Sequence, residues 1–144
     1  MPKQFLTFAT LKKKTYMAGI YIHIPFCKTR CIYCDFYSTT RSDLKRRYIN
    51  ALCEELTMRR DYLKNELNDV RTIYFGGGTP SQLEEEDFRQ VFDALSALYD
   101  LNACEEITLE ANPDDLTEDY VTMLRLLPFN RISMGIQTFD DATL

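Results

Sequence analysis

Short apolar segments alternate with longer amphipathic segments along the chain. The short segments are rich in β-branched and aromatic residues and predict buried strands over residues 20–24, 70–75, 106–110 and 131–136. The longer segments place an apolar residue at every third or fourth position and predict helices over about residues 42–67, 84–99 and 117–127. Strands that alternate with helices form right-handed βαβ units with a parallel sheet, so the predicted class is α/β.

The order of these segments predicts an incomplete domain. Four parallel strands do not close a barrel, and a further helix is expected to begin at Asp140, just before the last residue, Leu144. We therefore interpret residues 1–18 as an N-terminal extension and residues 19–144 as the N-terminal part of a larger, truncated core domain. Two readings of the extension remain open: Met17 is a natural start, or the segment is an ordinary disordered N-terminus.

Composition and charge exclude several classes of protein. The 144 residues are 45% hydrophobic and 27% charged, which is typical of a chain with a packed core. The formal net charge of −5 argues against a nucleic-acid partner, which would require a basic face. The chain has no run of 18 apolar residues, so no membrane span is predicted. Lysines 12–14 follow the apolar N-terminal residues, the reverse of a secretory signal, so we expect a cytoplasmic protein.

The first strand is followed by three closely spaced cysteines, Cys27-x-x-x-Cys31-x-x-Cys34, with Tyr33 just before the third. Three thiolates on one loop can bind three irons of a [4Fe-4S] cluster and leave the fourth iron open to a small molecule. Clusters that only carry electrons normally take four cysteines. The spacing therefore predicts a cluster with one open coordination position.

Two other interpretations of the cysteines are weaker. A structural zinc site needs a second pair of ligands, but Cys53 and Cys104 are isolated and the only histidine is His23. A disulfide framework is typical of secreted chains with an even number of cysteines, and this chain has five. Cys53 lies beside the apolar stripe of the first helix, so we expect it to pack in the core. A lone histidine is usually a core residue, and His23 receives no functional role.

Further unusual residues follow the other predicted strands. Gly76, Gly77 and Gly78 follow the second strand, Glu110 ends the third, and Gln137 follows the fourth. The carboxyl ends of parallel strands meet at one edge of the sheet, where ligands bind. Glycines let the backbone approach a ligand, and a carboxylate or an amide can hydrogen-bond hydroxyl and amino groups. The alternatives are a flexible turn for the glycines and surface or structural positions for the other two.

These motifs together resemble one family within the radical S-adenosylmethionine (SAM) superfamily. The resemblance is to the oxygen-independent coproporphyrinogen III oxidases and their heme-chaperone relatives, and it covers about residues 19–144. The matching segments are residues 21–37, 74–80, 110–113 and 135–139. The resemblance implies a partial parallel (β/α)6 barrel of radical SAM type, of which this chain supplies about four βα units.

The resemblance also implies the roles of the site residues. Cys27, Cys31 and Cys34 match the cluster ligands. The positions that match contacts to the cluster-bound SAM are Tyr21, Gly77 and Glu110. The positions that match contacts to a second SAM in the oxidase are Tyr33, Gly78, Thr79 and Gln137. The implied ligands are a [4Fe-4S] cluster, SAM, and heme or a porphyrinogen, with an electron donor that the sequence does not identify.

One departure from the oxidase pattern separates two possible functions. The oxidase branch has another cysteine two residues after the third cluster cysteine, whereas this chain has Phe36. Only 18 residues precede the first strand, where the oxidase has a longer extension. Both features resemble the heme-chaperone branch, so a chaperone that binds and delivers heme is expected. The alternative is the oxidase, an enzyme that decarboxylates propionate side chains through a SAM-derived radical; a third reading is a nonfunctional fragment.

Overall fold

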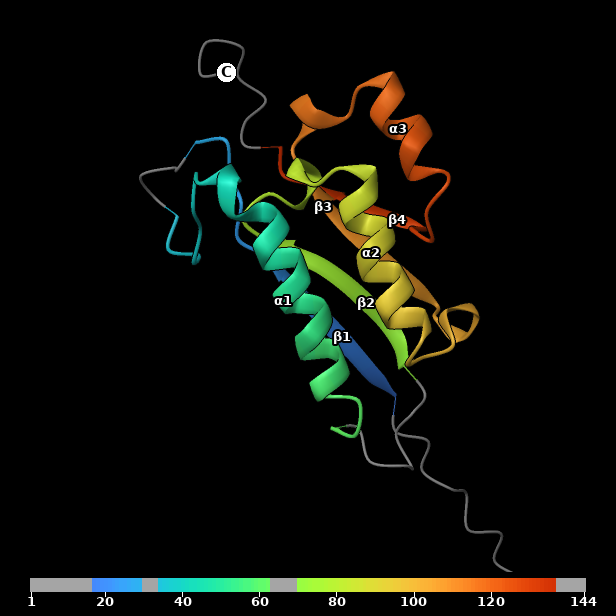
Figure 1. The fold of residues 1–144 in the computed structure, drawn as a ribbon. Coiled ribbons are helices and arrows are strands. Elements are labelled where there is room, and N and C mark those ends of the chain that lie inside the picture. Colours follow the sequence, from blue (N-terminus) through green and yellow to red (C-terminus); the bar gives the residue numbers. More distant parts are fainter. Residues whose placement is uncertain (1–16, 30–33, 63–69, 137–144) are drawn as a thin grey trace, which may run out of the picture.

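A computed structural model describes residues 17–29, 34–62 and 70–136. Its centre is a sheet of four parallel strands in the order β1-β2-β3-β4 (Figure 1). The strands are β1 (Ala18–Ile24), β2 (Val70–Gly77), β3 (Glu106–Ala111) and β4 (Arg131–Met134). This arrangement confirms the α/β class, with the four strands adjacent in the sheet in the order in which they occur in the chain.

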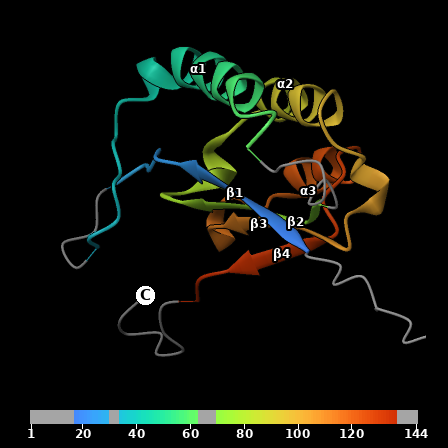
Figure 2. The same ribbon diagram turned by 90° about the horizontal axis from the view of Figure 1, so that it is seen from below.

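Three helices connect the strands: α1 (Lys45–Met58), α2 (Glu85–Ser96) and α3 (Glu118–Leu124). The helices lie on the same side of the sheet, with α1 and α2 next to each other (Figures 1 and 2). Thr117 caps α3, because its side chain accepts a hydrogen bond from the backbone N–H of Tyr120. Single 3-10 turns, at Ser42–Leu44, Pro80–Gln82, Leu101–Ala103 and Pro113–Asp115, occupy several loops.

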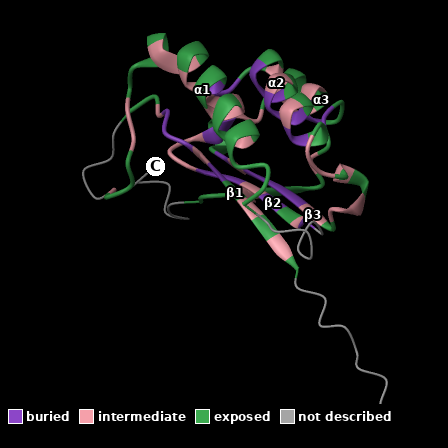
Figure 3. Cartoon of the chain, turned by 60° about the horizontal axis from the view of Figure 1, so that its bottom comes forward, coloured by how far each residue is buried: buried purple, intermediate pink, exposed green. Residues whose placement is uncertain are grey.

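The core lies between the sheet and the helices. Side chains alternate across the strands. The buried residues of β1, β2 and β3 form one core cluster with residues of the helices, and the colouring by burial shows these segments (Figure 3). β4 has no buried residue. Phe75 of β2 packs in this layer against Phe88 and Phe92 of α2, with Phe129 completing the aromatic cluster. Burial of this layer holds the strands in register and thereby aligns their carboxyl ends.

Several predicted boundaries were wrong by a few residues. The helix predicted over 42–67 is shorter, because α1 ends at Met58 and a turn follows, in which Tyr62 N–H donates to Arg59 O at 2.8 Å. β2 continues through Gly76 and Gly77, where the sequence predicted that it ends at Phe75. Both glycines still pair with β1, opposite His23 and Ile24. β4 ends at Met134 rather than at residue 136.

Other expectations lie outside the described residues. These are the segment 1–16, the predicted end of the first helix near residue 67, and the helix expected from Asp140. The division into an extension of residues 1–18 and a core domain from residue 19 therefore stays a prediction, although β1 already begins at Ala18. Within the described ranges, no helix has the length and apolar character that a membrane span requires.

Candidate functional site

The loops that follow the four strands surround one cavity of about 470 Å³. Its lining includes Cys27 and Cys34 from the cysteine loop, residues 77–79 at the end of β2 and just beyond it, and Glu110 near the end of β3. Residues 133–135 at the end of β4 close another side. The predicted meeting of the strand ends is therefore present, and it comprises residues more than 100 positions apart in the sequence.

The cysteine loop is tied to the sheet at its base. Cys27 N–H donates to Thr39 O at 3.0 Å, and Thr39 N–H donates to Pro25 O at 2.7 Å, so the two ends of the loop lie together. Cys27 and Cys34 are both partly buried. Cys31 and Tyr33, two residues predicted for the site, lie outside the described residues. In the described part of the chain, no three His, Cys, Asp or Glu side chains form a group that could hold a metal.

The glycine segment lies directly against the cysteine loop. Gly78 N–H donates to Ile24 O at 2.8 Å, and Thr79 N–H donates to Phe26 O at 2.7 Å, which extends the pairing of β1 and β2 past their ends. A Cβ atom on Gly78 would lie 2.9 Å from Phe26 O and 3.0 Å from Cys27 Sγ. Glycine is therefore required at position 78 for this close approach.

Gly77 needs glycine for a different reason. Its φ angle is +114°, a conformation that residues with a Cβ atom rarely adopt. A Cβ atom there would lie 2.6 Å from the His23 ring. His23 also contacts Tyr37, with Nε2 2.8 Å from its carbonyl oxygen, and Nδ1 is 3.3 Å from the Tyr21 hydroxyl. No role was predicted for His23, but its side chain lies at the edge of the site.

Glu110 joins the ends of β2 and β3. Its carboxylate accepts hydrogen bonds from the Tyr74 hydroxyl at 2.6 Å and from Gly77 N–H at 3.1 Å. The hydrogen bond to Glu110 is the main cause that raises the pKa of Tyr74 above its ordinary value. A carboxylate has about four acceptor positions, so Glu110 keeps acceptor capacity for a ligand.

Tyr21 lies beside this pair on the face of the sheet away from the helices. Its ring stacks on that of Tyr74, with centroids 6.0 Å apart and an interplanar angle of 19°. Burial and the charge of Glu110 raise the pKa of Tyr21. The side chain is nevertheless 57% exposed, which leaves a ring face accessible next to the glycines. A Cβ atom on Gly76 would lie 3.0 Å from Glu110 Oε2 and 3.1 Å from Tyr21 Cε2, so the three residues are close together. Tyr21 lies in the middle of β1, however, and is not among the residues that line the cavity.

Thr79 and Phe36 complete the cavity. The Thr79 hydroxyl donates to Cys27 Sγ at 3.6 Å, so it can hydrogen-bond a thiolate at that position. Phe36 lines the cavity and is 62% exposed. Gln137, the remaining predicted contact, lies outside the described residues.

The structure separates the other cysteines from the site. Cys53 packs beside the core and its Sγ lies 3.7 Å from Gln90 O. Burial raises the pKa of the Cys53 thiol, which disfavours the thiolate that a metal would need. Cys104 Sγ lies 3.3 Å from Val70 O, at the opposite end of the sheet from the cavity. Both cysteines have structural positions, as predicted for Cys53.

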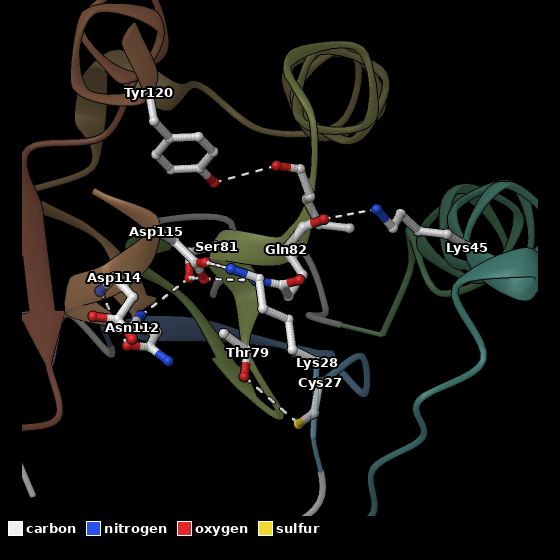
Figure 4. Close-up of polar contacts among 11 residues, drawn as sticks. Cys27, Lys28, Lys45, Thr79, Ser81, Gln82, Asn112, Asp114, Asp115 and Tyr120 are labelled. Carbon is white, nitrogen blue, oxygen red and sulfur yellow. Dashed lines mark hydrogen bonds and ion pairs between the residues drawn. The ribbon is translucent and has the colours of Figure 1, made fainter. Parts of the chain in front are cut away.

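A buried carboxylate next to the cavity was missed by the sequence analysis. Asp115 accepts hydrogen bonds from Lys28 at 2.5 Å, Ser81 at 2.6 Å and Gln82 at 2.6 Å (Figure 4). Burial alone would raise the pKa of Asp115, but these three donors outweigh it and lower the pKa below its ordinary value. In the sequence, Asp115 is one of several acidic residues after the third strand, and no spacing pattern distinguishes it.

A comparison with models of protein families shows to which family the chain belongs. The family model of the radical SAM superfamily matches residues 21–144. The chain belongs to the radical SAM superfamily. The match includes the cysteine loop, the glycine segment and Glu110, so the residues around the cavity lie inside the radical SAM region.

Individual proteins narrow the relationship. The chain is 41% identical over 125 residues to the heme chaperone HemW of Lactococcus lactis and 40% identical over 130 residues to that of Bacillus subtilis. These matches cover 86% and 89% of this chain, but only 31% and 34% of the two relatives. A solved structure described as coproporphyrinogen III oxidase (HemN) from Escherichia coli, a radical SAM enzyme, superposes with a TM-score of 0.74 at 30% identity. It covers 90% of this chain and 30% of that one, so the four strands correspond to part of the HemN barrel.

The donor groups around the cavity fit a radical SAM cofactor pair. Cys27 and Cys34 place two sulfur atoms in the lining, and close backbone approach is possible at Gly77 and Gly78. The acceptor capacity of Glu110 suits the hydroxyl or amino groups of a nucleoside or amino acid. The arrangement therefore combines soft ligands for iron with polar groups for a SAM-like molecule.

Proposed function

We propose that this chain is part of a heme chaperone that binds a [4Fe-4S] cluster and SAM and delivers heme to acceptor proteins. The cluster ligands in this proposal are Cys27, Cys31 and Cys34, two of which line the cavity. A cytoplasmic location belongs to the same proposal. Because the chain spans about a third of the HemW relatives, the function refers to the longer protein, and heme contacts are not assigned.

The observation that carries this proposal is Phe36. The position two residues after Cys34 would hold a further cysteine in the oxidase pattern, and here it holds an aromatic side chain that lines the cavity. The exposed Phe36 side chain adds apolar surface at a position where the oxidase pattern has a thiol. The similarity to HemW at about 40% identity supports the same reading.

The proposed SAM contacts follow from the chemistry of the cavity. Gly77 lets its backbone approach the amino acid part of SAM, and Tyr21 offers an aromatic face beside it. Glu110 accepts hydrogen bonds from hydroxyl or amino groups while Tyr74 and Gly77 hold its carboxylate in place. A bound cluster and SAM together supply one-electron chemistry, and the residues of the chain bind and orient them.

Four further residues are proposed for a second SAM in the case of an oxidase. They are Tyr33, Gly78, Thr79 and Gln137. Gly78 and Thr79 lie against Cys27, and a hydrogen bond from Thr79 to the Cys27 sulfur gives Thr79 a second possible function in tuning the cluster. The oxidase remains the alternative function, favoured by the similarity to the HemN structure.

The first experiment separates the two functions. The full-length protein is reconstituted anaerobically and incubated with coproporphyrinogen III, SAM and a reductant, and the products are separated by chromatography. A chaperone gives no decarboxylated product but binds heme stoichiometrically in a spectrophotometric titration. Formation of the decarboxylated product would establish the oxidase despite Phe36.

A control for the cofactors accompanies this experiment. The reconstituted protein should contain about four irons per chain, and the electron paramagnetic resonance spectrum of the reduced cluster should change when SAM is added. A spectrum that is the same with and without SAM contradicts the open iron position. Absence of iron contradicts the cluster itself.

A further inference from the structure

Asp115 connects three of the loops that surround the cavity. Its side chain is 5% exposed, and it lies in the 3-10 turn after β3. Lys28 donates to Oδ1 from the cysteine loop, whereas Ser81 and Gln82 donate to Oδ2 from the loop after β2 (Figure 4). Ser81 in turn accepts a hydrogen bond from Asn112 N–H at 3.1 Å. One buried carboxylate thus links the loops after β1, β2 and β3.

The connection matters because of where Lys28 lies. On one side of Cys27, backbone hydrogen bonds to Thr39 and from Thr79 hold the loop against the sheet. Lys28 is on the other side, as the first residue of the spacer between Cys27 and Cys31. Its ion pair with Asp115 therefore holds the backbone directly after Cys27.

The carboxylate is preorganised for this contact. Ser81 and Gln82 occupy Oδ2 at 2.6 Å each, so Oδ1 is directed to Lys28 without rearrangement of the Asp115 side chain. By contrast, the pair between Arg89 and Glu85 joins two exposed side chains on one helix. Exposed pairs contribute little because both side chains lose freedom, whereas here one partner is already held.

We propose that Asp115 is a positioning residue for the cluster and that it acts through Lys28 on the adjacent residue Cys27. The inference rests on the proposed function in one respect, namely that the three cysteines bind a [4Fe-4S] cluster. Groups beyond the ligands of a metal commonly orient those ligands and slow the loss of the metal. Asp115 performs this task from the loop after β3, although none of its hydrogen bonds to described residues is to a cysteine.

The test measures how fast the cluster is lost. Full-length wild type, Lys28→Met, Lys28→Arg, Asp115→Asn and the double variant Lys28→Met/Asp115→Asn are reconstituted anaerobically, and iron transfer to a ferrous chelator is followed by absorbance. We expect Lys28→Met and Asp115→Asn to lose iron about tenfold faster than wild type. Lys28→Arg should restore a rate within about twofold of wild type, because it keeps the charge. The double variant should be no faster than the faster single variant, since both changes break one contact.

A matched control and a second measurement distinguish loss of this contact from unfolding of the protein. Arg89→Met removes the cation of an ion pair whose two residues do not line the cavity, and it should lose iron at the wild-type rate. Lys28 is 61% exposed, so Lys28→Met should keep the wild-type circular dichroism spectrum and melting temperature even if Asp115→Asn does not. The electron paramagnetic resonance spectrum of reduced Lys28→Met should also show a weaker response to SAM.

The outcomes distinguish this inference from the proposed function. Equal rates of iron loss for wild type and Lys28→Met overturn the positioning role, while a wild type that holds its cluster leaves the proposed function intact. If Arg89→Met also loses iron faster than wild type, the effect is general destabilisation, and the positioning role of Asp115 is overturned. A wild type that assembles no cluster at all contradicts the proposed function itself.

Discussion

The carboxylate of Glu110 accepts a hydrogen bond from the backbone N–H of Gly77 at 3.1 Å, although the two residues lie 33 positions apart. The contact joins the carboxyl ends of β2 and β3 and holds the carboxylate beside the glycine backbone. Tyr74 binds the other carboxylate oxygen at 2.6 Å. Glu110 is thereby fixed in orientation before any ligand arrives, which reduces the entropy cost of binding.

This arrangement predicts the effect of removing the charge at position 110. Glu110→Gln keeps the size of the side chain and can still accept from Gly77, so the fold should persist. SAM affinity should fall about tenfold or more, because a hydrogen bond to a charged acceptor contributes roughly 1.5–3 kcal/mol. Equilibrium dialysis with labelled SAM measures the change. Tyr74→Phe is the control: it keeps the carboxylate and should cost less affinity, and an unchanged affinity in Glu110→Gln contradicts the proposed contact.

The cysteines predict a clear separation between ligands and core residues. Cys27→Ala and Cys31→Ala should abolish the cluster, because three irons then share two thiolates. Cys53→Ala should keep about four irons per chain, since Cys53 packs beside Gln90 on the helical side of the sheet. Iron and sulfide analysis after anaerobic reconstitution checks this. Equal loss of iron in the Cys27 and Cys53 variants would show that the ligand assignment is wrong.

Gly78 is predicted to tolerate no side chain. In Gly78→Ala the new Cβ atom would lie 2.9 Å from Phe26 O and 3.0 Å from Cys27 Sγ, so the backbone of the cysteine loop must move. The cost should be about 1–3 kcal/mol of unfolding free energy, with lower iron content after reconstitution. Urea unfolding followed by circular dichroism measures the first effect.

Gly19→Ala is the matched control for this substitution. Its Cβ atom would meet Thr72 Oγ1 at 2.6 Å, but the next atom, Thr72 O, is 3.7 Å away. Rotation of one hydroxyl side chain relieves the contact, so the stability should change less than in Gly78→Ala and the iron content should stay at the wild-type level. If both variants behave alike, the close approach at Gly78 is not specific to the site.

Tyr120 predicts a loss of stability at alkaline pH. Burial, and to a smaller extent the charge of Asp115, raises its pKa, and its hydroxyl donates to Leu83 O at 3.2 Å. Because the folded-state pKa lies above the unfolded value, the contribution to stability is full below about pH 10 and is lost as the pH rises above it. Urea unfolding at several alkaline pH values measures this slope.

Tyr120→Phe should flatten that dependence. At neutral pH the variant should be less stable by about 1 kcal/mol, because Leu83 O loses its hydrogen bond. Tyr62→Phe, at a position that is 75% exposed, should leave both the neutral stability and the alkaline slope close to wild type. A wild-type slope in Tyr120→Phe would contradict the assignment to this residue.

The order of strands and helices could be predicted because each element carries its own periodicity. The apolar run at residues 20–24 and the stripe of α2 are local properties of the chain. The ends of elements were less accurate where pairing with a neighbour decides them. β2 extends through Gly77 because β1 offers a partner as far as Ile24, and a glycine run by itself indicates a turn.

Part of the site could be predicted for the same reason. Cys27, Cys34, Gly77, Gly78, Thr79 and Glu110 follow strands whose ends must meet in a parallel sheet, and all six line one cavity. His23 and Asp115, which lie next to the cavity without lining it, were not predicted as site residues. His23 lies at the site because its ring packs against Gly77 of the neighbouring strand. The position of Asp115 depends on how the loop after β3 folds back toward Lys28.

The sequence by itself determined the alternation of elements, the cysteine spacing and the strand-end residues, because these depend on neighbours along the chain. Only the tertiary structure decided which polar groups share a partner. Lys28 and Asp115 are 87 positions apart, and they meet because three loops converge beside the cavity. The Asp115 carboxylate is buried there, and a buried carboxylate is stable only when hydrogen-bond donors surround it. Such pairings depend on the exact positions of the loops in the folded protein, because a shift of a loop by about 3 Å would break the hydrogen bonds.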